Sequence, residues 1–325
     1  MSSRTGNRDP GSRSPEPEWP SSGALTSAAR HDRPERPVRH DSGEVQSRTR
    51  LLDLPVGLVE DLRCGGVRRS DSAEHYSPQF QVCLPYHGLF VWHVGRDTVV
   101  GDANQVLFVT GGEGYRISRP LPSGYAELII TPELCVLSEI ANATGARLPS
   151  HALFRRRSWR ASPPLQSFRA RFLSWATGAS DVDDLEAEEL VLSLLRYALQ
   201  SDGAHGGRGA ATTARLIRRT KQFLEAELAD PIRLRDVGRA VGASPAYLTH
   251  LFRRVEGTSL HQYLTQLRLA RALVELPHAD DLTTLAIDIG FSSHSHFTAA
   301  FRRAFGVTPS EFRQTSRGRL RPSPP

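Results

Sequence analysis

The pattern of apolar positions divides the chain into segments. Residues 1–50 hold few large apolar side chains among many Ser, Pro, Gly and Arg residues. Such a segment buries too little apolar surface to offset the entropy of ordering, so we expect it to be disordered. A Gly-rich run at 201–211 indicates a flexible linker, and 319–325 indicates a frayed tail. Two folded domains are therefore expected, at 51–200 and 212–318.

Short apolar runs separated by turn residues make up the first part of residues 51–200. They recur at roughly 8–12-residue spacing, which favours a small antiparallel sandwich or barrel. The predicted strands are Gln79–Leu84, Leu89–Val94, Thr98–Val100, Gln105–Thr110, Gly114–Ile117 and Ala126–Ile130.

Two helices are predicted after these strands, because the apolar period changes beyond Arg160. The first opens at Pro163 and ends near Gly178. The second starts within 181–184, and its apolar face is Val191, Leu192, Leu195 and Leu199. That face suits pairing with a second copy in a homodimer, and the alternative is that it docks on its own β unit. Both interpretations stay open.

An internal duplication occupies the last third of the chain. Each copy has the layout of a helix-turn-helix. One extra residue enters the second copy, because the offset between matched positions changes from 48 to 49. At the first offset Leu234, Val237, Val241, Gly242 and Ser244 match Leu282, Leu285, Ile289, Gly290 and Ser292, and at the second Leu248, Phe252, Arg253, Arg254 and Gly257 match Phe297, Phe301, Arg302, Arg303 and Gly306.

Each copy is predicted to contain a short helix, a tight turn and a second helix. Gly242 and Gly290 end the short helices, since glycine accepts a positive φ, and Ser244 and Ser293 cap the second helices. The positions expected to face the core are Leu248, Leu251, Phe252 and Val255 in one copy and Phe297, Ala300, Phe301 and Ala304 in the other. The positions expected to face outward are Ala246, Thr249, His250 and Arg253, and His294, Ser295, Thr298 and Arg302.

One long helix is predicted to join the copies, from its cap at Ser259 to Leu276, before Pro277. At about 1.5 Å per residue it is about 27 Å long. A spacer of that length could hold two recognition helices in successive major grooves, which are about 34 Å apart. A capping box at Thr308–Glu311 begins a last short helix.

The net charge of +6 is unevenly distributed along the chain. Residues 51–200 hold 14 arginines against 17 acidic residues, whereas 212–325 hold 16 arginines and one lysine against 10 acidic residues. The positive excess at the C-terminal end indicates a polyanionic partner. Lys221 is the only lysine beside 40 arginines, and we interpret that as a bias of composition.

Residues 213–316 resemble the DNA-binding domain of the AraC/XylS family of bacterial transcription regulators. The residues that carry the resemblance are Ser244, Leu248, Leu251–Arg254, Gly257–Ser259, Tyr263, Arg268, Ala272, Ile287, Gly290–Ser293, Phe297, Phe301–Arg303, Gly306–Pro309, Phe312 and Arg313. The resemblance implies an all-α tandem helix-turn-helix of seven helices, with the second helix of each subdomain in the major groove. Residues 75–200 more loosely resemble the family's cupin-like β-barrel sensor and dimerisation region, so the expected fold is mixed.

The same resemblance implies roles for the outward residues. Those placed at base edges are Ala246, Thr249, His250, His294, Ser295 and Ala299. Those placed at phosphates are Ser244, Arg253, Arg254, Ser293, Thr298, Arg302 and Arg303. The implied function is that of a sequence-specific, effector-responsive activator that binds double-stranded DNA and RNA polymerase as a homodimer.

A small barrel can also hold a small ligand. The candidate lining residues are Phe90, Trp92, His93, Phe108, Tyr115 and Arg116, although strand aromatics more often serve as plain core. His75, His87 and His93 lack the tight spacing of a metal site, so neither a metal nor a cofactor is expected.

Two alternative functions need features that the sequence lacks. A cupin-type enzyme would need a clustered metal triad, and a repair protein would need a nucleophilic cysteine beside such a cluster, whereas Cys64, Cys83 and Cys135 are scattered. We therefore expect no catalytic residue and no enzyme. The absence of an 18-residue apolar run and of a signal peptide favours a cytoplasmic protein without a membrane partner.

Overall fold

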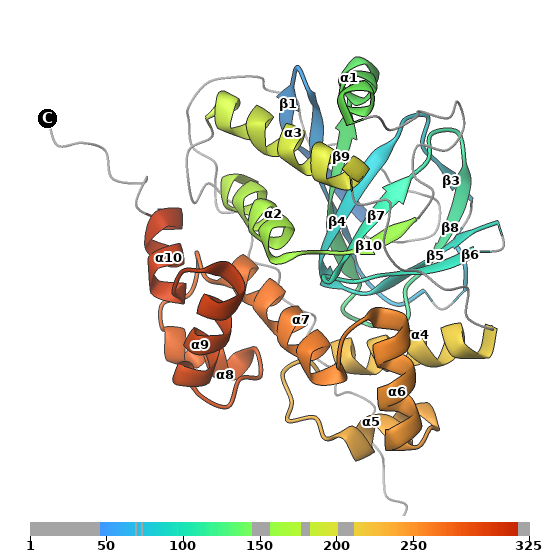
Figure 1. The fold of residues 1–325 in the computed structure, drawn as a ribbon, viewed down its shortest axis with the longest axis vertical. Helices are drawn as coiled ribbons and strands as arrows, with labels where there is room; N and C mark the ends of the chain where they lie inside the picture. Colours follow the sequence, from blue (N-terminus) through green and yellow to red (C-terminus); the bar gives the residue numbers. More distant parts are fainter. Residues whose placement is uncertain are drawn as a thin grey trace, which may run out of the picture. The chain divides into compact units, whose positions relative to one another are not determined.

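The computed structural model describes residues 46–68, 70–72, 74–95, 97–144, 157–176, 183–200 and 211–317, apart from a few side chains at element ends. An N-terminal β domain and a C-terminal helical domain follow one another along the chain (Figure 1). The part of the expected disordered segment before residue 46, residues 201–210 of the expected linker and the expected tail at 319–325 lie outside the described residues.

The described strands of the N-terminal β domain form two antiparallel sheets. The six-stranded sheet has the order β1 (Gln46–Leu54), β2 (Gly57–Cys64), β9 (Tyr125–Pro132), β4 (Gln81–Gly88), β7 (Gln105–Val109) and β10 (Ser158–Arg160). The four-stranded sheet has the order β3 (His75–Tyr76), β8 (Gly114–Ser118), β5 (Phe90–Val94) and β6 (Asp97–Gly101). The expected antiparallel β unit is thus present, as two sheets and without a closed barrel among the described strands.

The β domain begins earlier than residue 51, where sequence reasoning placed its start. Strand β1 starts at Gln46 and pairs along its whole length with β2. Its exposed charges hide the strand pattern in the sequence, but they have partners across the sheet: the guanidinium of Arg48 donates to both carboxylate oxygens of Glu60, at 3.0 and 2.6 Å. Residues 46–50 therefore belong to the domain.

The six-stranded sheet has a hydrophobic core on each face, because side chains alternate along its strands. One core lies between the two sheets and contains Phe90, Trp92 and Tyr125. The other lies beneath the helices α1 (Leu134–Thr144), α2 (Pro163–Ala176) and α3 (Asp184–Gln200). On α3 the buried side chains are Ala187, Val191, Leu194 and Leu195, so the apolar face of this helix docks on its own domain.

The C-terminal domain contains the helices α4 (Ala211–Ala226), α5 (Leu234–Val241), α6 (Pro245–Glu256), α7 (Leu260–Glu275), α8 (Leu282–Asp288), α9 (His294–Phe305) and α10 (Pro309–Arg317). The predicted caps define their ends. Gly242 has φ +75°, the Ser244 hydroxyl accepts from the amide of Tyr247, and Ser259 forms a capping box with Gln262. Thr308 and Glu311 form the second capping box.

Helix α7 contributes to the cores of both helix-turn-helix units. Its residues Tyr263, Leu264 and Leu267 pack with α4, α5 and α6, whereas Leu269 and Leu273 pack with α8 and α9. Its 16 residues span about 24 Å. Each unit therefore completes its core on the same rod.

The extra residue of the second copy lies in its turn. Ser293, and not Ser292, is the N-cap of α9, so that Ser293 is the structural counterpart of Ser244. The lengthened turn places Phe291 in the core of the second unit, where its ring lies 5.3 Å from that of Phe297.

Arg268 of α7 connects the two units. Its Nε and Nη2 atoms donate to the carbonyl oxygens of Leu228 and Asp230, each at 2.8 Å, after the end of α4. The same contact is packed against Gly290, which has φ +91°. A Cβ atom at position 290 would lie 2.7 Å from both Arg268 Nε and the carbonyl oxygen of Leu228.

This packing predicts unequal costs for alanine at the two turn glycines. Gly242→Ala, with φ +75° and nothing within 4 Å of an added Cβ, should lower the free energy of unfolding by about 1 kcal/mol through backbone strain alone. Gly290→Ala adds steric overlap with backbone and should cost at least about 2 kcal/mol. Urea unfolding of the two variants measures both values, and equal costs would contradict the packing described.

Candidate nucleic-acid interface

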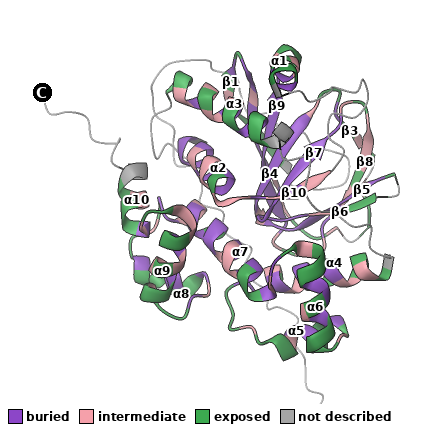
Figure 2. Cartoon of the chain, in the orientation of Figure 1, coloured by how far each residue is buried: buried purple, intermediate pink, exposed green. Residues whose placement is uncertain are grey.

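The exposed face of α6 carries most of the side chains predicted there. Ala246, His250 and Arg253 are exposed, together with Arg254 in the last turn. Figure 2 shows much of α6 in the colour of exposed residues. Leu248, Leu251 and Phe252 are fully buried on the opposite face. Helix α6 is therefore fixed to its unit by one side and presents the other to solvent.

Two predictions on α6 differ from the structure. Val255, expected in the core, is 43% exposed because the last turn extends past the buried cluster of Leu248, Leu251 and Phe252. Thr249 is half-buried, and its hydroxyl donates to the carbonyl oxygen of Pro245 in its own helix. The Thr249 hydroxyl proton is therefore used within the helix.

Tyr247 is a surface residue that sequence reasoning missed. It lies in the first turn of α6 and is 53% exposed. Helical spacing places it in line with His250 and Arg254, three and seven residues further on. The signal available in the sequence was a large aromatic residue in the first turn of a predicted helix, beside the predicted base-edge positions.

Helix α9 repeats this arrangement in the second unit. Ser295, Ala299, Arg302 and Arg303 are exposed, and His294 is half-buried. Thr298, expected to face outward, is also half-buried. Its Oγ1 atom is shielded from solvent without a hydrogen-bond partner among the described residues, so this hydroxyl does not face the surface. The exposed His296 is held by the hydroxyl of Ser292, 3.1 Å from its Nδ1 atom.

The four arginines at the ends of α6 and α9 are exposed cations. Arg253, Arg254, Arg302 and Arg303 form no ion pair within the described part of the chain. Arginines of the β domain behave differently: Arg157 donates to both oxygens of Glu113, at 2.7 and 2.6 Å, and Arg171 pairs with Glu186. A guanidinium without a carboxylate partner suits a phosphate oxygen.

The side chains predicted to line a ligand site do not all meet. Phe90, Trp92 and Tyr115 share the core between the sheets, where the rings of Trp92 and Tyr115 are 5.3 Å apart. Phe108 lies in the other core, on the opposite face of the six-stranded sheet.

His93 and Arg116 are also separate from that core. Strand alternation turns both to the outer face of the four-stranded sheet, where they lie 3.2 and 3.4 Å from carboxylate oxygens of Asp71. The six residues predicted to line one ligand site thus lie in three places: the core between the sheets, the core beneath the helices, and the outer face of the four-stranded sheet.

Glu127 is the polar group of the inter-sheet core that sequence reasoning missed. It is 2% exposed on β9, between Tyr125 and Ile129 on the same face. Burial raises the pKa of its carboxyl group to about 8, and Arg48 opposes the shift. Glu127 Oε2 and Trp92 Nε1 are buried without hydrogen-bond partners among the described residues.

The described residues contain no group of three or more His, Cys, Asp or Glu side chains that could hold a metal ion. Cys64 and Cys83 are buried and Cys135 is exposed, and all three are free thiols. Among the helices described, none is both long and apolar enough to cross a membrane.

Comparison with known proteins places the similarity mainly in the C-terminal domain. A helix-turn-helix domain family matches residues 237–315. The regulatory protein SoxS of Salmonella typhimurium is 33% identical over 93 residues, which are 28% of this chain and 87% of SoxS. The regulatory protein PocR of the same organism is 28% identical over 167 residues, and the match covers 48% of this chain. The chain spans about half of PocR, 55% of its length.

Solved structures give two further likenesses. A transcriptional regulator from Chromobacterium violaceum is 30% identical with a TM-score of 0.31, over 33% of this chain and 96% of that one. ToxT from Vibrio cholerae is 10% identical with a TM-score of 0.34, over 79% of this chain and 97% of that one.

The burial of Glu127 predicts how the stability of the β domain depends on pH. Its pKa of about 8 in the folded state lies above the ordinary value of 4.5, so the folded state holds a proton that the unfolded chain releases. Wild-type stability should therefore fall as pH rises from 4.5 towards 8. Glu127→Gln removes this loss. The free energy of unfolding of the variant minus that of the wild type should therefore increase by roughly 3 kcal/mol between pH 4.5 and pH 7.5.

Denaturant unfolding across that pH range measures the difference. The exposed Glu139 of α1 supplies a matched control, because Glu139→Gln should follow the wild-type pH dependence. A pH-independent offset between Glu127→Gln and the wild type would show that the carboxyl group does not titrate as its burial requires.

Proposed function

The chain belongs to the AraC/XylS family of bacterial transcription regulators, and we propose that α6 and α9 enter successive major grooves of one DNA duplex. The observation that carries the proposal is the repetition of one exposed surface. Each unit ends its second helix with an adjacent pair of arginines that form no ion pair among the described residues, Arg253–Arg254 and Arg302–Arg303, at matching positions. A single basic helix could be a solvated surface, but a duplicated one on a shared rod suits a periodic polyanion.

The arginine pairs contact phosphates in this proposal, because a guanidinium fork matches phosphate oxygens. Ser244 and Ser293 lie at the N-termini of the same helices, where backbone amides and the helix dipole also favour a phosphate. Each serine hydroxyl already accepts one capping bond, at 3.3 and 3.1 Å, and can still donate its proton. Such contacts position the protein without selecting a sequence.

Base selection falls to the side chains nearer the start of each helix. His250, together with the newly identified Tyr247, offers hydrogen bonds from α6, and His294 and Ser295 offer them from α9. Ala246, Ala299 and the methyl group of Thr249 are small apolar surfaces that suit thymine methyl groups. The partly buried Thr298 has no place in this surface.

We also propose that the β domain responds to a small effector and that the chain acts as an activator. Phe90, Trp92 and Tyr115 remain candidates for the effector site, joined by Glu127. Support comes from two buried polar atoms that have no hydrogen-bond partner in the described part of the chain, Glu127 Oε2 and Trp92 Nε1, since such atoms carry a free-energy cost that a ligand could remove. A relative named as an activator, RhaR of Klebsiella pneumoniae, is 30% identical over 40% of this chain.

A homodimer, RNA polymerase as a partner and a cytoplasmic location stay predictions. The apolar face of α3, one possible dimer contact, is occupied by its own domain through Val191, Leu194 and Leu195. Any dimer contact on this helix would use its exposed side, where Leu185 is 67% and Tyr197 is 38% exposed.

The proposed roles predict opposite consequences for two substitutions. Arg302→Ala should weaken binding to all duplexes alike and reduce the salt dependence by about one ion, since a phosphate contact carries no sequence information. His250→Ala should relax the preference at one base pair, at a cost of about 1–3 kcal/mol for the preferred base. Selection of bound duplexes from a random pool, followed by titration, measures both. A relaxed preference in Arg302→Ala and a uniform loss in His250→Ala would reverse the assignment.

The number of arginines predicts the salt response of the wild type. If four to six arginines meet phosphates, log K should fall with log[salt] at a slope of roughly −4 to −5. A gel-shift titration across salt concentrations measures the slope. Binding that does not respond to salt would contradict the proposed phosphate contacts.

A further inference from the structure

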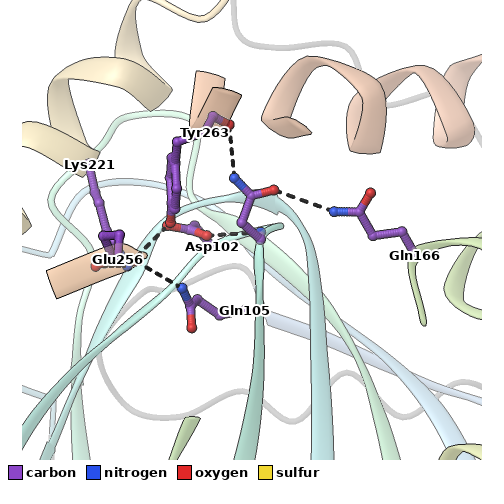
Figure 3. Close-up of polar contacts among 7 residues, drawn as sticks. Asp102, Gln105, Gln166, Lys221, Glu256 and Tyr263 are labelled. Atoms are coloured by element: carbon purple, nitrogen blue, oxygen red, sulfur yellow. Dashed lines mark hydrogen bonds and ion pairs between the residues drawn. The ribbon is translucent and has the colours of Figure 1, made fainter. Parts of the chain in front are cut away.

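A cluster of buried polar side chains joins the β domain to the first helix-turn-helix unit (Figure 3). We call it the interdomain cluster. The β domain contributes Asp102, Asn104 and Gln105 from the start of β7 and its preceding turn, and Gln166 from α2; the helical domain contributes Lys221 of α4, Glu256 of α6 and Tyr263 of α7. Asp102, Asn104 and Tyr263 are fully buried.

Tyr263 is the centre of these contacts. Its hydroxyl donates to Asp102 Oδ2 at 2.5 Å, and its backbone carbonyl oxygen accepts from Asn104 Nδ2 at 3.0 Å. The amide of Gln166 extends the network to Asn104 at 3.4 Å. The first turn of α7 is therefore held to the β domain by both its side chain and its backbone.

Lys221 connects the same contacts to the recognition helix α6. Its Nζ atom lies 3.0 Å from Glu256 Oε1, 4.0 Å from Asp102 Oδ2 and 5.3 Å from the centre of the Tyr263 ring. It is the only lysine of the chain, at a buried point where a compact ammonium group meets three partners. Its position corrects the interpretation that this lysine reflects composition alone.

Gln105 also spans the two domains. Its amide nitrogen lies 3.5 Å from Glu256 Oε2 (Figure 3). With the amide turned over, it accepts from Lys221 Nζ at 3.3 Å and donates to the carbonyl oxygen of Trp159 at 3.0 Å. Both orientations link β7 to the first unit.

The charged groups of the interdomain cluster are largely buried. Asp102 and Glu256 share one lysine, and burial raises the pKa of Asp102. The neighbouring Glu225 of α4 accepts from the backbone amide of Gly88, and its burial raises its pKa to about 8. Because buried charges lose hydration that their partners return only in part, such an interface adds little net stability.

The β domain also contacts the rest of α7. In the middle of the helix, Gln266 accepts from the guanidinium of Arg160 on β10. Towards its end, Leu273 packs with Ala170 of α2 in the core of the second unit, and Val274 packs against the core beneath α1, α2 and α3. The rod that carries both units is thus held along its length by the β domain.

We propose that Asp102, Lys221, Glu256 and Tyr263 are positioning residues for DNA binding: they fix the first recognition helix relative to the second, so that the β domain presents both to one duplex. The inference rests on the proposed function. Glu256 ends α6, two residues after Arg254, and Tyr263 lies in the first turn of α7. The cluster therefore holds both sides of the short connection at Gly257–Ser259.

The exposure of the recognition surfaces gives the direction of the effect. Arg253, Arg254, Arg302 and Arg303 stay exposed while the cluster is formed, so docking on the β domain does not cover them. Two binding units held at a fixed separation bind the second groove as an intramolecular step, whereas loosely joined units lose that advantage. Disrupting the cluster should therefore weaken binding that needs both units and spare binding that needs one.

The experiment compares full-length variants on two duplexes. Selection with the wild type supplies a duplex of about 24 bp, which offers two major grooves on one face, and its halves of about 12 bp offer one. Asp102→Asn and Tyr263→Phe should bind the long duplex about 10-fold more weakly and the halves within about twofold of the wild type. Fluorescence anisotropy measures each Kd. Controls are Asp71→Asn and Tyr76→Phe, which change an ion pair and an exposed ring that are not part of the interdomain cluster.

The outcomes distinguish failure of the proposed DNA binding from failure of the proposed positioning role. If the wild type selects no duplex, the proposed function fails before the variants are tested. If the wild type binds but both variants match it, bind the long duplex more tightly, or lose affinity equally for long and half duplexes, the cluster does not position the helices. Circular dichroism monitors folding, and Tyr263→Phe, which removes one hydroxyl group, serves as the test if Asp102→Asn does not fold.

Discussion

The shared use of α7 is the constraint on which the C-terminal domain depends. Each helix-turn-helix unit has a short first helix, eight residues in α5 and seven in α8, too short to be stable without tertiary packing. Both complete their cores on the same rod, through Tyr263 and Leu264 on one side and Leu269 and Leu273 on the other. Any change in the position of α7 therefore reaches both units.

The contacts around that rod differ in kind along its length. Within the helical domain they are apolar contacts and capping bonds, together with the hydrogen bonds from Arg268 to the carbonyl oxygens of Leu228 and Asp230. Between the domains they are mainly polar at the first unit and apolar at the second, where Ala170 joins the core. A polar interface has more geometric requirements than an apolar one of equal size, so the two units are attached to the β domain with unequal specificity.

The helical domain was predictable because its helix ends depend on residues close in the sequence. The β-sheet contacts and the interdomain cluster depend on residues far apart in the sequence and were not predicted. Gly242, Ser244 and Ser259 fix helix ends through bonds to residues four or fewer positions away, so the expected bounds hold to within about two residues. Strand β1 was missed because charged residues alternate along it, and the partner of Arg48 is Glu60 on β2, 12 positions away. The set containing Phe108 and His93 failed to assemble because period-2 alternation places neighbours on opposite faces. Tyr263 and Asp102 are 161 positions apart, and no local pattern relates them.

The single inserted residue in the second turn makes the two units unlike. Phe291 fills the core there, and the exposed rows that begin with Ala246 and with Ser295 differ in chemistry. Two unlike helix-turn-helix units in a fixed order along one chain form a binding surface with two different ends. A DNA site contacted by both units consequently has a defined orientation. A site with its two halves in the reverse order is a different ligand, even for a single copy of the chain.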